Sequence, residues 1–206
     1  IVVVHVGDML ITGERSAIEE IEAHLLSTYR MGIEEGGTRT IQFLGRDLQR
    51  TGRGFKFGVG RRYIEKSSAE LGITGTRSTM GWTEARPDEE ELDKSEQHQY
   101  KVALGKLAWV DRSDIRCAIV KLSTRLGRAR SMEKNLQRVW MYLRGTASWH
   151  QAVEAGNPVG FPEAEKGTVY VHADADYRAC MTDGKSISGC VVWVRGRAGW
   201  YRVTRA

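Results

Sequence analysis

The sequence has few of the residues that build disulfides and zinc sites. Its 206 residues include three cysteines, Cys117, Cys180 and Cys190, and none of them lies in a CxxC pair. The five histidines are scattered, and none has zinc-ligand spacing to a cysteine. An odd number of widely spaced cysteines is typical of reduced thiols. We therefore expect an intracellular protein, of the cytoplasm, the nucleus or both.

Long apolar runs are also absent. No run approaches the roughly 20 residues that a membrane-spanning helix needs, so we expect no membrane partner. The first eleven residues are apolar, but they contain His5 and Asp8 and lack the basic leader and cleavage site of a signal peptide. Because the chain begins without Met inside an expected strand, we expect it to be a piece of a longer protein.

The composition is that of a globular protein with a moderate positive charge. Hydrophobic residues make up 41% and charged residues 28%, and the length suffices for one large domain or two small ones. Lys and Arg outnumber Asp and Glu by 31 to 26, which gives a net charge of +5. A basic surface suits a polyanionic partner such as nucleic acid, although many basic proteins bind none.

Apolar periodicity in the first third predicts a hairpin, a helix, two strands and a short helix. The hairpin turns at Gly7 and Asp8, and Ser16 with Glu19 forms a capping-box pattern before the helix that Gly32 ends. The expected ranges are strands over 1–6 and 9–12, strands over 41–48 and 55–59, and a helix over 62–71.

The second half predicts three helices followed by three strands. The helices begin near Ser95, Ser113 and Ser131, and Gly145 ends the last of them. After residue 167 the apolar period changes from 3.6 to 2, which predicts strands over 169–172, 188–194 and 200–203. The expected buried faces of the helices are Tyr100, Ala103, Leu104 and Leu107; Ile115, Ala118, Ile119 and Leu122; and Leu136, Val139, Trp140 and Leu143.

Two acidic positions are candidates for metal ligands. Asp8 lies on a tight turn between two apolar strands, where a carboxylate is held rigidly, as Mg²⁺-dependent phosphoryl transfer requires. Asp174 and Asp176 follow an alternating strand at i, i+2 spacing, so they share a face if the strand continues. Asp8 can equally satisfy its turn, and the later pair can be a solvated strand end.

A basic surface is the third candidate site. Arginines and a lysine cluster at the end of the second expected helix and along the third, with Trp140 and Tyr142 among them. Such a surface can follow a phosphate backbone, and it can equally be a solvated helix face. Its members are Arg125, Arg128, Arg130, Lys134, Arg138 and Arg144.

The order of several short motifs resembles copia-type retrotransposon pol polyproteins over nearly the whole chain, except the connector at 75–94. In sequence order these motifs are HVGD (5–8), MLITG (9–13), FLGRDL (43–48), YIEK (63–66), DRSDI (111–115), YLRGT (142–146), HADAD (172–176) and GKSISG (184–189). None of them is specific alone, and the ordered set carries the resemblance.

The resemblance implies the end of a reverse transcriptase followed by the start of a ribonuclease H domain. HVGD takes the place of the polymerase Tyr-Val-Asp-Asp box, and Phe43, Leu44 and Gly45 belong to a hairpin that grips the primer. Asp174 matches the first metal-binding aspartate of the nuclease. The implied cofactor is Mg²⁺, and the implied partners are an RNA–DNA hybrid or primer–template and the remainder of the pol polyprotein.

This resemblance also implies a division of the chain and an α+β fold. The fold would combine a palm remnant with a helical thumb and connection and a truncated ribonuclease-H-like sheet, one face of which lacks its later helix. The implied segments are 1–60 (palm remnant with the primer-grip-like hairpin), 61–74 (start of the thumb), 75–94 (exposed connector), 95–155 (helical thumb and connection), 156–167 (linker) and 168–206 (truncated nuclease domain).

Departures from the family pattern predict that catalysis is lost in this chain. Gly7 stands where the family has its first box aspartate, and a glycine offers no metal ligand. The remaining polymerase acid and the later nuclease acids would lie outside residues 1–206. We therefore expect a retrotransposon polymerase and ribonuclease H fragment that is inactive as it stands. The alternatives are a non-catalytic remnant that binds nucleic acid, and a pseudogene product without a selected role.

Overall fold

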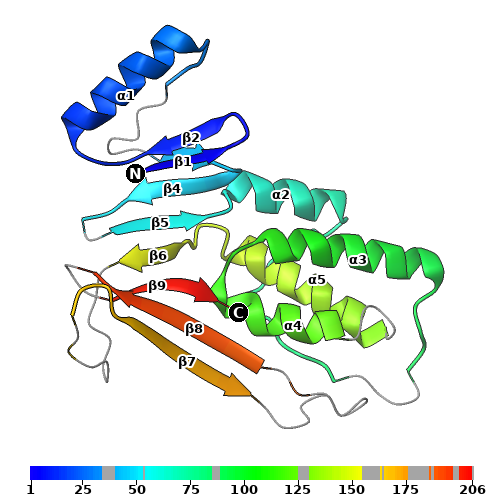
Figure 1. The fold of residues 1–206 in the computed structure, drawn as a ribbon. Helices are drawn as coiled ribbons and strands as arrows, with labels where there is room; N and C mark the ends of the chain where they lie inside the picture. Colours follow the sequence, from blue (N-terminus) through cyan, green and yellow to red (C-terminus); the bar gives the residue numbers. More distant parts are fainter. Residues whose placement is uncertain are drawn as a thin grey trace.

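The computed structural model combines helices with three small antiparallel sheets (Figure 1). It describes residues 1–33, 40–52, 54–84, 89–124, 130–154, 163, 165–175, 186, 188–196 and 200–205. In chain order the elements are β1 (Val2–His5), β2 (Asp8–Ile11), α1 (Arg15–Thr28), β3 (Thr40–Phe43), β4 (Arg46–Arg50), β5 (Gly54–Gly58), α2 (Arg61–Glu70), α3 (Lys94–Trp109), η1 (Ser113–Ile115), α4 (Arg116–Thr124), α5 (Arg130–Gly145), β6 (Gln151–Glu154), β7 (Val169–Ala175), β8 (Ser188–Arg195) and β9 (Trp200–Arg205).

The hydrophobic core lies among the helices and centres on α5. Val139, Trp140 and Leu143 of α5 are fully buried, because apolar residues recur along one face of this helix at helical spacing. The indole Nε1–H of Trp140 donates to the carbonyl of Ala103 on α3 at 3.3 Å. Tyr100 of α3 donates its hydroxyl to the carbonyl of Leu122 on α4 at 2.9 Å. These bonds fix three helices around one core.

The segment between α2 and α3 runs along α5. The backbone N–H of Arg77 donates to the carbonyl of Met141 at 3.1 Å. Asn135, which is fully buried, pairs with the backbone of Thr83 through both its amide oxygen and its amide nitrogen. Most side chains of residues 75–84 and 89–94 are nevertheless exposed. The segment is therefore held to α5 by hydrogen bonds of its backbone, while its buried Ile73 and Leu92 join the hydrophobic core.

The four-stranded sheet joins distant parts of the chain in the order β3-β4-β5-β6. β3 and β4 form a hairpin whose two-residue turn is Leu44 and Gly45, with φ angles of 53° and 69°. Positive φ at both turn residues matches the twist of a tight antiparallel hairpin. β6 pairs antiparallel with β5 from Gly54 opposite Glu154 to Phe57 opposite Gln151.

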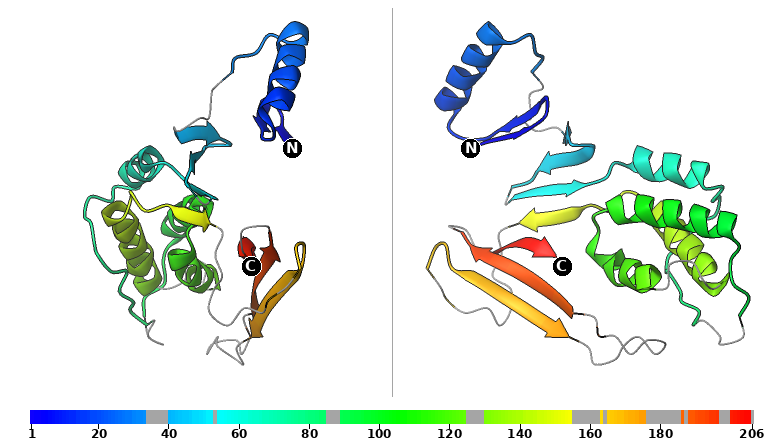
Figure 2. Two further views of the ribbon diagram at one scale, coloured as in Figure 1. Left: turned by 90° about the vertical axis from the view of Figure 1, so that its left-hand side faces the viewer. Right: turned by 45° about the vertical axis from the view of Figure 1, so that its right-hand side comes forward.

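The N-terminal hairpin and α1 lie apart from the helical core in both views of Figure 2. β1 pairs with β2 from Val2 opposite Ile11 to His5 opposite Asp8. No side chain of residues 1–33 is buried. The apolar face of α1, formed by Ile18, Ile21 and Leu25, is only half-buried. This part of the chain therefore draws little stability from tertiary packing.

The third sheet is an antiparallel meander in the order β7-β8-β9. Tyr170 lies opposite Trp193, and its ring also contacts His172 and Trp200 on the same face, at centroid distances of 4.7 and 6.1 Å. On the other face Val169 and Val171 are 57% and 54% exposed. The meander therefore has one aromatic face, on which Trp200 is buried, and one valine-rich face that stays in contact with solvent.

Several expectations from the sequence are confirmed. The N-terminal hairpin, the three helices of the core and the three C-terminal strands all form within a few residues of their expected limits. All twelve residues expected on the buried helix faces are buried.

Three local expectations are wrong or incomplete. Helix α1 begins at Arg15 after Glu14, with no side-chain cap, so Ser16 does not cap it. The single strand expected over 41–48 is two strands, because Leu44 and Gly45 reverse the chain. Strand β6 was not expected, since its four residues carry no clear alternation and depend on pairing with β5.

A glycine-to-alanine pair tests the packing of the 73–84 segment on α5. A Cβ at Gly145 would lie 2.4 Å from the carbonyl oxygen of Arg77, whereas one at Gly105 in α3 meets nothing within 4 Å. We expect Gly145→Ala to lower the free energy of unfolding by about 1–3 kcal/mol through overpacking. Gly105→Ala should raise the free energy of unfolding by about 0.5–1 kcal/mol, because alanine has a higher helix propensity than glycine at an exposed position inside a helix. Urea unfolding measures both, and equal effects would contradict the close contact.

Candidate functional site

Asp8 lies at the tip of the N-terminal hairpin. Val6 and Gly7 form the turn, and Asp8 is the first residue of β2, opposite His5. The turn is thus one residue earlier than the expected Gly7-Asp8 turn. The Asp8 side chain is exposed, and a Cβ built at Gly7 meets nothing within 4 Å. The hairpin tip therefore presents one carboxylate to solvent beside a position with open space.

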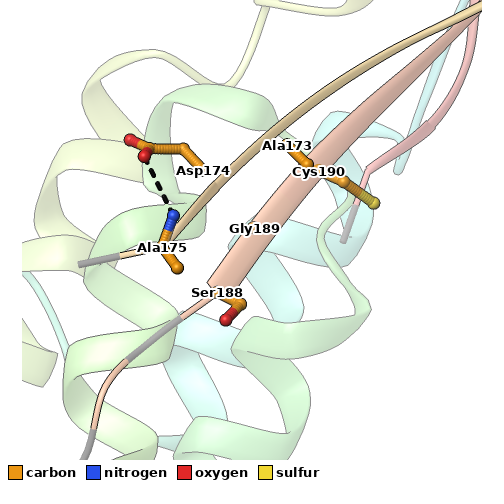
Figure 3. A pocket seen from close by; sticks show the side chains of 6 residues that line it. All are labelled: Ala173, Asp174, Ala175, Ser188, Gly189 and Cys190. Carbon is orange, nitrogen blue, oxygen red and sulfur yellow. Dashed lines mark hydrogen bonds between the residues drawn. The ribbon is translucent and has the colours of Figure 1, made fainter. Parts of the chain in front are cut away.

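Asp174 lies on β7, opposite Gly189 of β8, and is exposed. Its Oδ1 accepts the backbone N–H of Ala175 at 2.9 Å, as Figure 3 shows. The residue lines a shallow pocket of about 440 Å³ with Ala173, Ala175, Ser188, Gly189 and Cys190. In Figure 3 the Asp174 carboxylate and the Cys190 thiol point to opposite sides of the strand pair. Asp176 lies outside the described residues.

The described residues do not fit a two-metal Mg²⁺ site. Asp8 and Asp174 belong to different sheets. Within the described part of the chain, no group of three or more His, Cys, Asp or Glu side chains could hold a metal ion. Mg²⁺ takes several oxygen ligands in octahedral geometry, which a single exposed carboxylate cannot supply. Neither acid alone therefore supports metal-assisted phosphoryl transfer.

The hairpin containing Phe43, Leu44 and Gly45 is anchored to the end of α3. The Arg46 guanidinium lies over the Trp109 ring at 5.0 Å from its centroid and 3.8 Å from the Asp111 carboxylate. It also donates a long hydrogen bond of 3.4 Å to the carbonyl of Trp109. Phe43 and Leu44 are half-buried and Gly45 is exposed. The turn thus projects from the sheet while its base is fixed.

Arg130, at the start of α5, is surrounded by carboxylates. Glu96 accepts a hydrogen bond from its guanidinium, and Glu133 and Glu90 lie 3.6 and 3.8 Å from it. The hydrogen bond from Arg130 is the main reason why the pKa of Glu96 falls below its ordinary value. These contacts neutralise most of the charge that Arg130 would offer to a phosphate. Arg125 and Arg128 lie outside the described residues.

The other basic residues of α5 divide into bound and exposed side chains. Arg138 donates to the hydroxyl of Thr83 and is half-buried, and Arg144 donates to the carbonyls of Ile73 and Gly75. Both arginines therefore hold the segment between α2 and α3 against α5. Lys134 is exposed. Among the described members of the predicted basic surface, Lys134 is the one most open to a polyanion.

Motifs 111–115 and 142–146 meet in space around Arg112. The Arg112 side chain is 94% buried by contacts to both segments and donates to the Asp114 carboxylate and to the carbonyl and hydroxyl of Thr146. Its guanidinium also lies 5.4 Å from the Tyr142 ring centroid and 5.6 Å from that of Trp149. We call Arg112, Asp114, Tyr142, Thr146 and Trp149 the Arg112 cluster. It joins the start of η1 to the end of α5.

The Arg112 cluster is stabilised by charge and hydrogen bonding together. Tyr142 donates its hydroxyl to Asp114 Oδ2 at 2.6 Å. Burial raises the pKa of Asp114, but the hydrogen bonds from Arg112 and Tyr142 outweigh it and lower the pKa below the ordinary 3.8. Burial and the Asp114 contact raise the pKa of Tyr142. Spacing alone did not reveal this cluster, although both its motifs stood out in the sequence.

No family model, no curated protein and no solved structure matches this chain. None of the described helices is both long and apolar enough to cross a membrane. The functional assignment therefore depends on the ordered motifs and on the positions of their residues in the fold.

The low pKa of Asp114 predicts an acid-sensitive contribution to stability. Because the folded-state pKa lies below the unfolded value of 3.8, the contribution is present above pH 3.8 and is lost as the pH falls through the folded value. We expect Asp114→Asn to destabilise the chain in urea near neutral pH, and the stabilities of wild type and variant to converge as the pH falls through the folded-state pKa of Asp114. Glu19→Gln, which removes an exposed ion pair with Arg15, serves as the control. A stability difference that does not change with pH would contradict the assignment.

Proposed function

We propose that this chain is part of a copia-type retrotransposon pol polyprotein, covering the end of an RNA-directed DNA polymerase and the start of a ribonuclease H domain. The observation that carries the proposal is the N-terminal hairpin, in which Asp8 is exposed at the tip beside Gly7. A carboxylate on a tight β-turn is the arrangement that the resemblance implies for the polymerase box.

Two further features support the same proposal. The motif with Phe43, Leu44 and Gly45 forms a tight hairpin anchored at its base, as a primer-gripping hairpin requires. Asp174 lies on the first strand of a three-stranded antiparallel meander, where the resemblance expects the first nuclease aspartate. The division of the chain into palm, thumb, connection and nuclease segments follows from the resemblance and is part of this proposal.

As it stands, the chain polymerises nothing and cuts RNA–DNA hybrids poorly or not at all. Two-metal phosphoryl transfer needs several fixed carboxylates, and Gly7 removes one that the family uses. Among the described residues, no group of three or more His, Cys, Asp or Glu side chains could hold a metal ion. What the chain retains under this proposal is the ability to hold a duplex, through the projecting hairpin and exposed cations such as Lys134.

A binding assay with an RNA–DNA primer–template tests this function. We expect salt-sensitive binding by fluorescence anisotropy, with no Mg²⁺-dependent primer extension and no cleavage in the same samples. Lys134→Glu should weaken binding several-fold, whereas Lys101→Glu, an equal charge change on exposed α3, should weaken it less. Absence of binding at low salt would contradict the duplex-holding role. Primer extension by the wild-type chain would contradict the loss of polymerase activity.

Restoring an aspartate at position 7 tests the polymerase box itself. Open space around Gly7 accommodates the new side chain, so we expect Gly7→Asp to keep the wild-type melting temperature. Two neighbouring carboxylates should bind Mn²⁺ several-fold more tightly than one, as titration calorimetry can measure. Gly32→Asp, between Met31 and Ile33 and also in open space, adds a carboxylate without an acidic neighbour on either side and is the matched control. Equal Mn²⁺ affinity of the two variants would argue against a metal-binding tip.

A further inference from the structure

The outer edge of β1 presents backbone N–H and C=O groups at two positions, Val2 and Val4. Ile1 and Thr12 exchange hydrogen bonds of 2.7 and 2.9 Å, so they form a hydrogen-bonded pair of the hairpin. Hydrogen-bonded and non-hydrogen-bonded pairs alternate along an antiparallel ladder. Val3 and His5 therefore bond to β2, whereas the N–H and C=O groups of Val2 and Val4 point away from it. Among the described strands, β2 alone pairs with β1.

This edge lacks the charged side chains and the proline that often protect an edge strand. Val2, Val3 and Val4 are 43%, 45% and 58% exposed. Residues 1–6 contain no proline, lysine, arginine or acid. The hairpin is apolar on both faces, because Val2 and Val4 share one face with Met9 and Ile11, and Val3 shares the other with Leu10. A short, uncharged edge of this kind is a template for another strand.

We propose that β1 pairs with β1 of a second copy of this chain, antiparallel about a two-fold axis at Val3. In this register Val2 of one copy lies opposite Val4 of the other, and the two Val3 residues face each other. Because Val2 and Val4 lie symmetrically about Val3, their outward N–H and C=O groups satisfy one another. The result is a four-stranded sheet with the order β2-β1-β1-β2.

A second copy is favoured over a partner of different chemistry because the edge is complementary to itself. A closed two-fold contact buries the same groups on both copies, and this register leaves no outward group of Val2 or Val4 unpaired. It brings valine opposite valine on both faces and no like charges together. His5 lies beyond the paired valines, opposite Ile1 of the other copy.

The small size of this contact makes the dimer concentration-dependent. A stable interface buries at least about 1,000 Å², and three paired residues on each copy bury less than that. Affinity would come mainly from backbone hydrogen bonds, as in other cases of strand addition. The dimer should therefore form at high protein concentration and dissociate on dilution. This inference does not depend on the proposed function.

Charge variants at Val3 test both the dimer and its register. Analytical ultracentrifugation of the full chain across a dilution series should show a reversible monomer–dimer equilibrium for wild type. Val3→Lys alone and Val3→Glu alone should be monomeric, because the axis places like charges directly opposite each other. An equimolar mixture of the two variants should regain the dimer, since each lysine then faces a glutamate.

Two further variants separate edge pairing from other effects. Val4→Pro removes an outward N–H that takes no part in the β1–β2 ladder, so it should abolish the dimer. Val6→Lys adds the same charge as Val3→Lys at a turn residue outside the paired edge, and it should leave the dimer intact. A monomeric wild type at every concentration would overturn the proposal. A dimer that survives Val4→Pro, or a mixture that stays monomeric, would overturn the register.

Discussion

The burial of one face of α5 is the constraint on which the described fold depends. Trp140 and Leu143 on this face are inaccessible to solvent, and α2, α3 and α4 all pack around them. The segment before α3 crosses the same helix through Arg77 and Thr83, and the Arg112 cluster fixes its end. Loss of the apolar side chains on this face would disrupt the packing of four helices at once. The N-terminal hairpin and α1, which lack any buried side chain, do not share this support.

Much of the helical core could be predicted from the sequence, because a helix that buries one face carries apolar residues at helical spacing. Ile115, Ile119 and Leu122 recur at helical spacing and are all buried. The β3–β4 turn could not be predicted in this way, since it requires positive φ at Leu44, where a leucine gives no signal. Strand β6 was missed because its four residues become a strand only through pairing with β5.

The candidate sites show which contacts can be predicted from the sequence and which cannot. A hairpin tip at Asp8 and a strand through Asp174 follow from local alternation, which the sequence contains. The partners of Arg130 do not, since Glu90 and Glu96 come from a different segment, and spacing along α5 cannot reveal them. The net charge of +5 is thus a poor guide to the cations available to a ligand, because the fold uses several of them internally.

The pairing of β6 with β5 has a consequence for the order of folding. Gly54 and Glu154 are neighbours in the sheet, although a hundred residues separate them along the chain. Such non-local contacts form late, because the loop between them must close first. During synthesis on a ribosome, β5 would emerge with one unpaired edge and keep it until all the core helices had been made. A nascent chain of this design is therefore most exposed to misassociation before its last core helix folds.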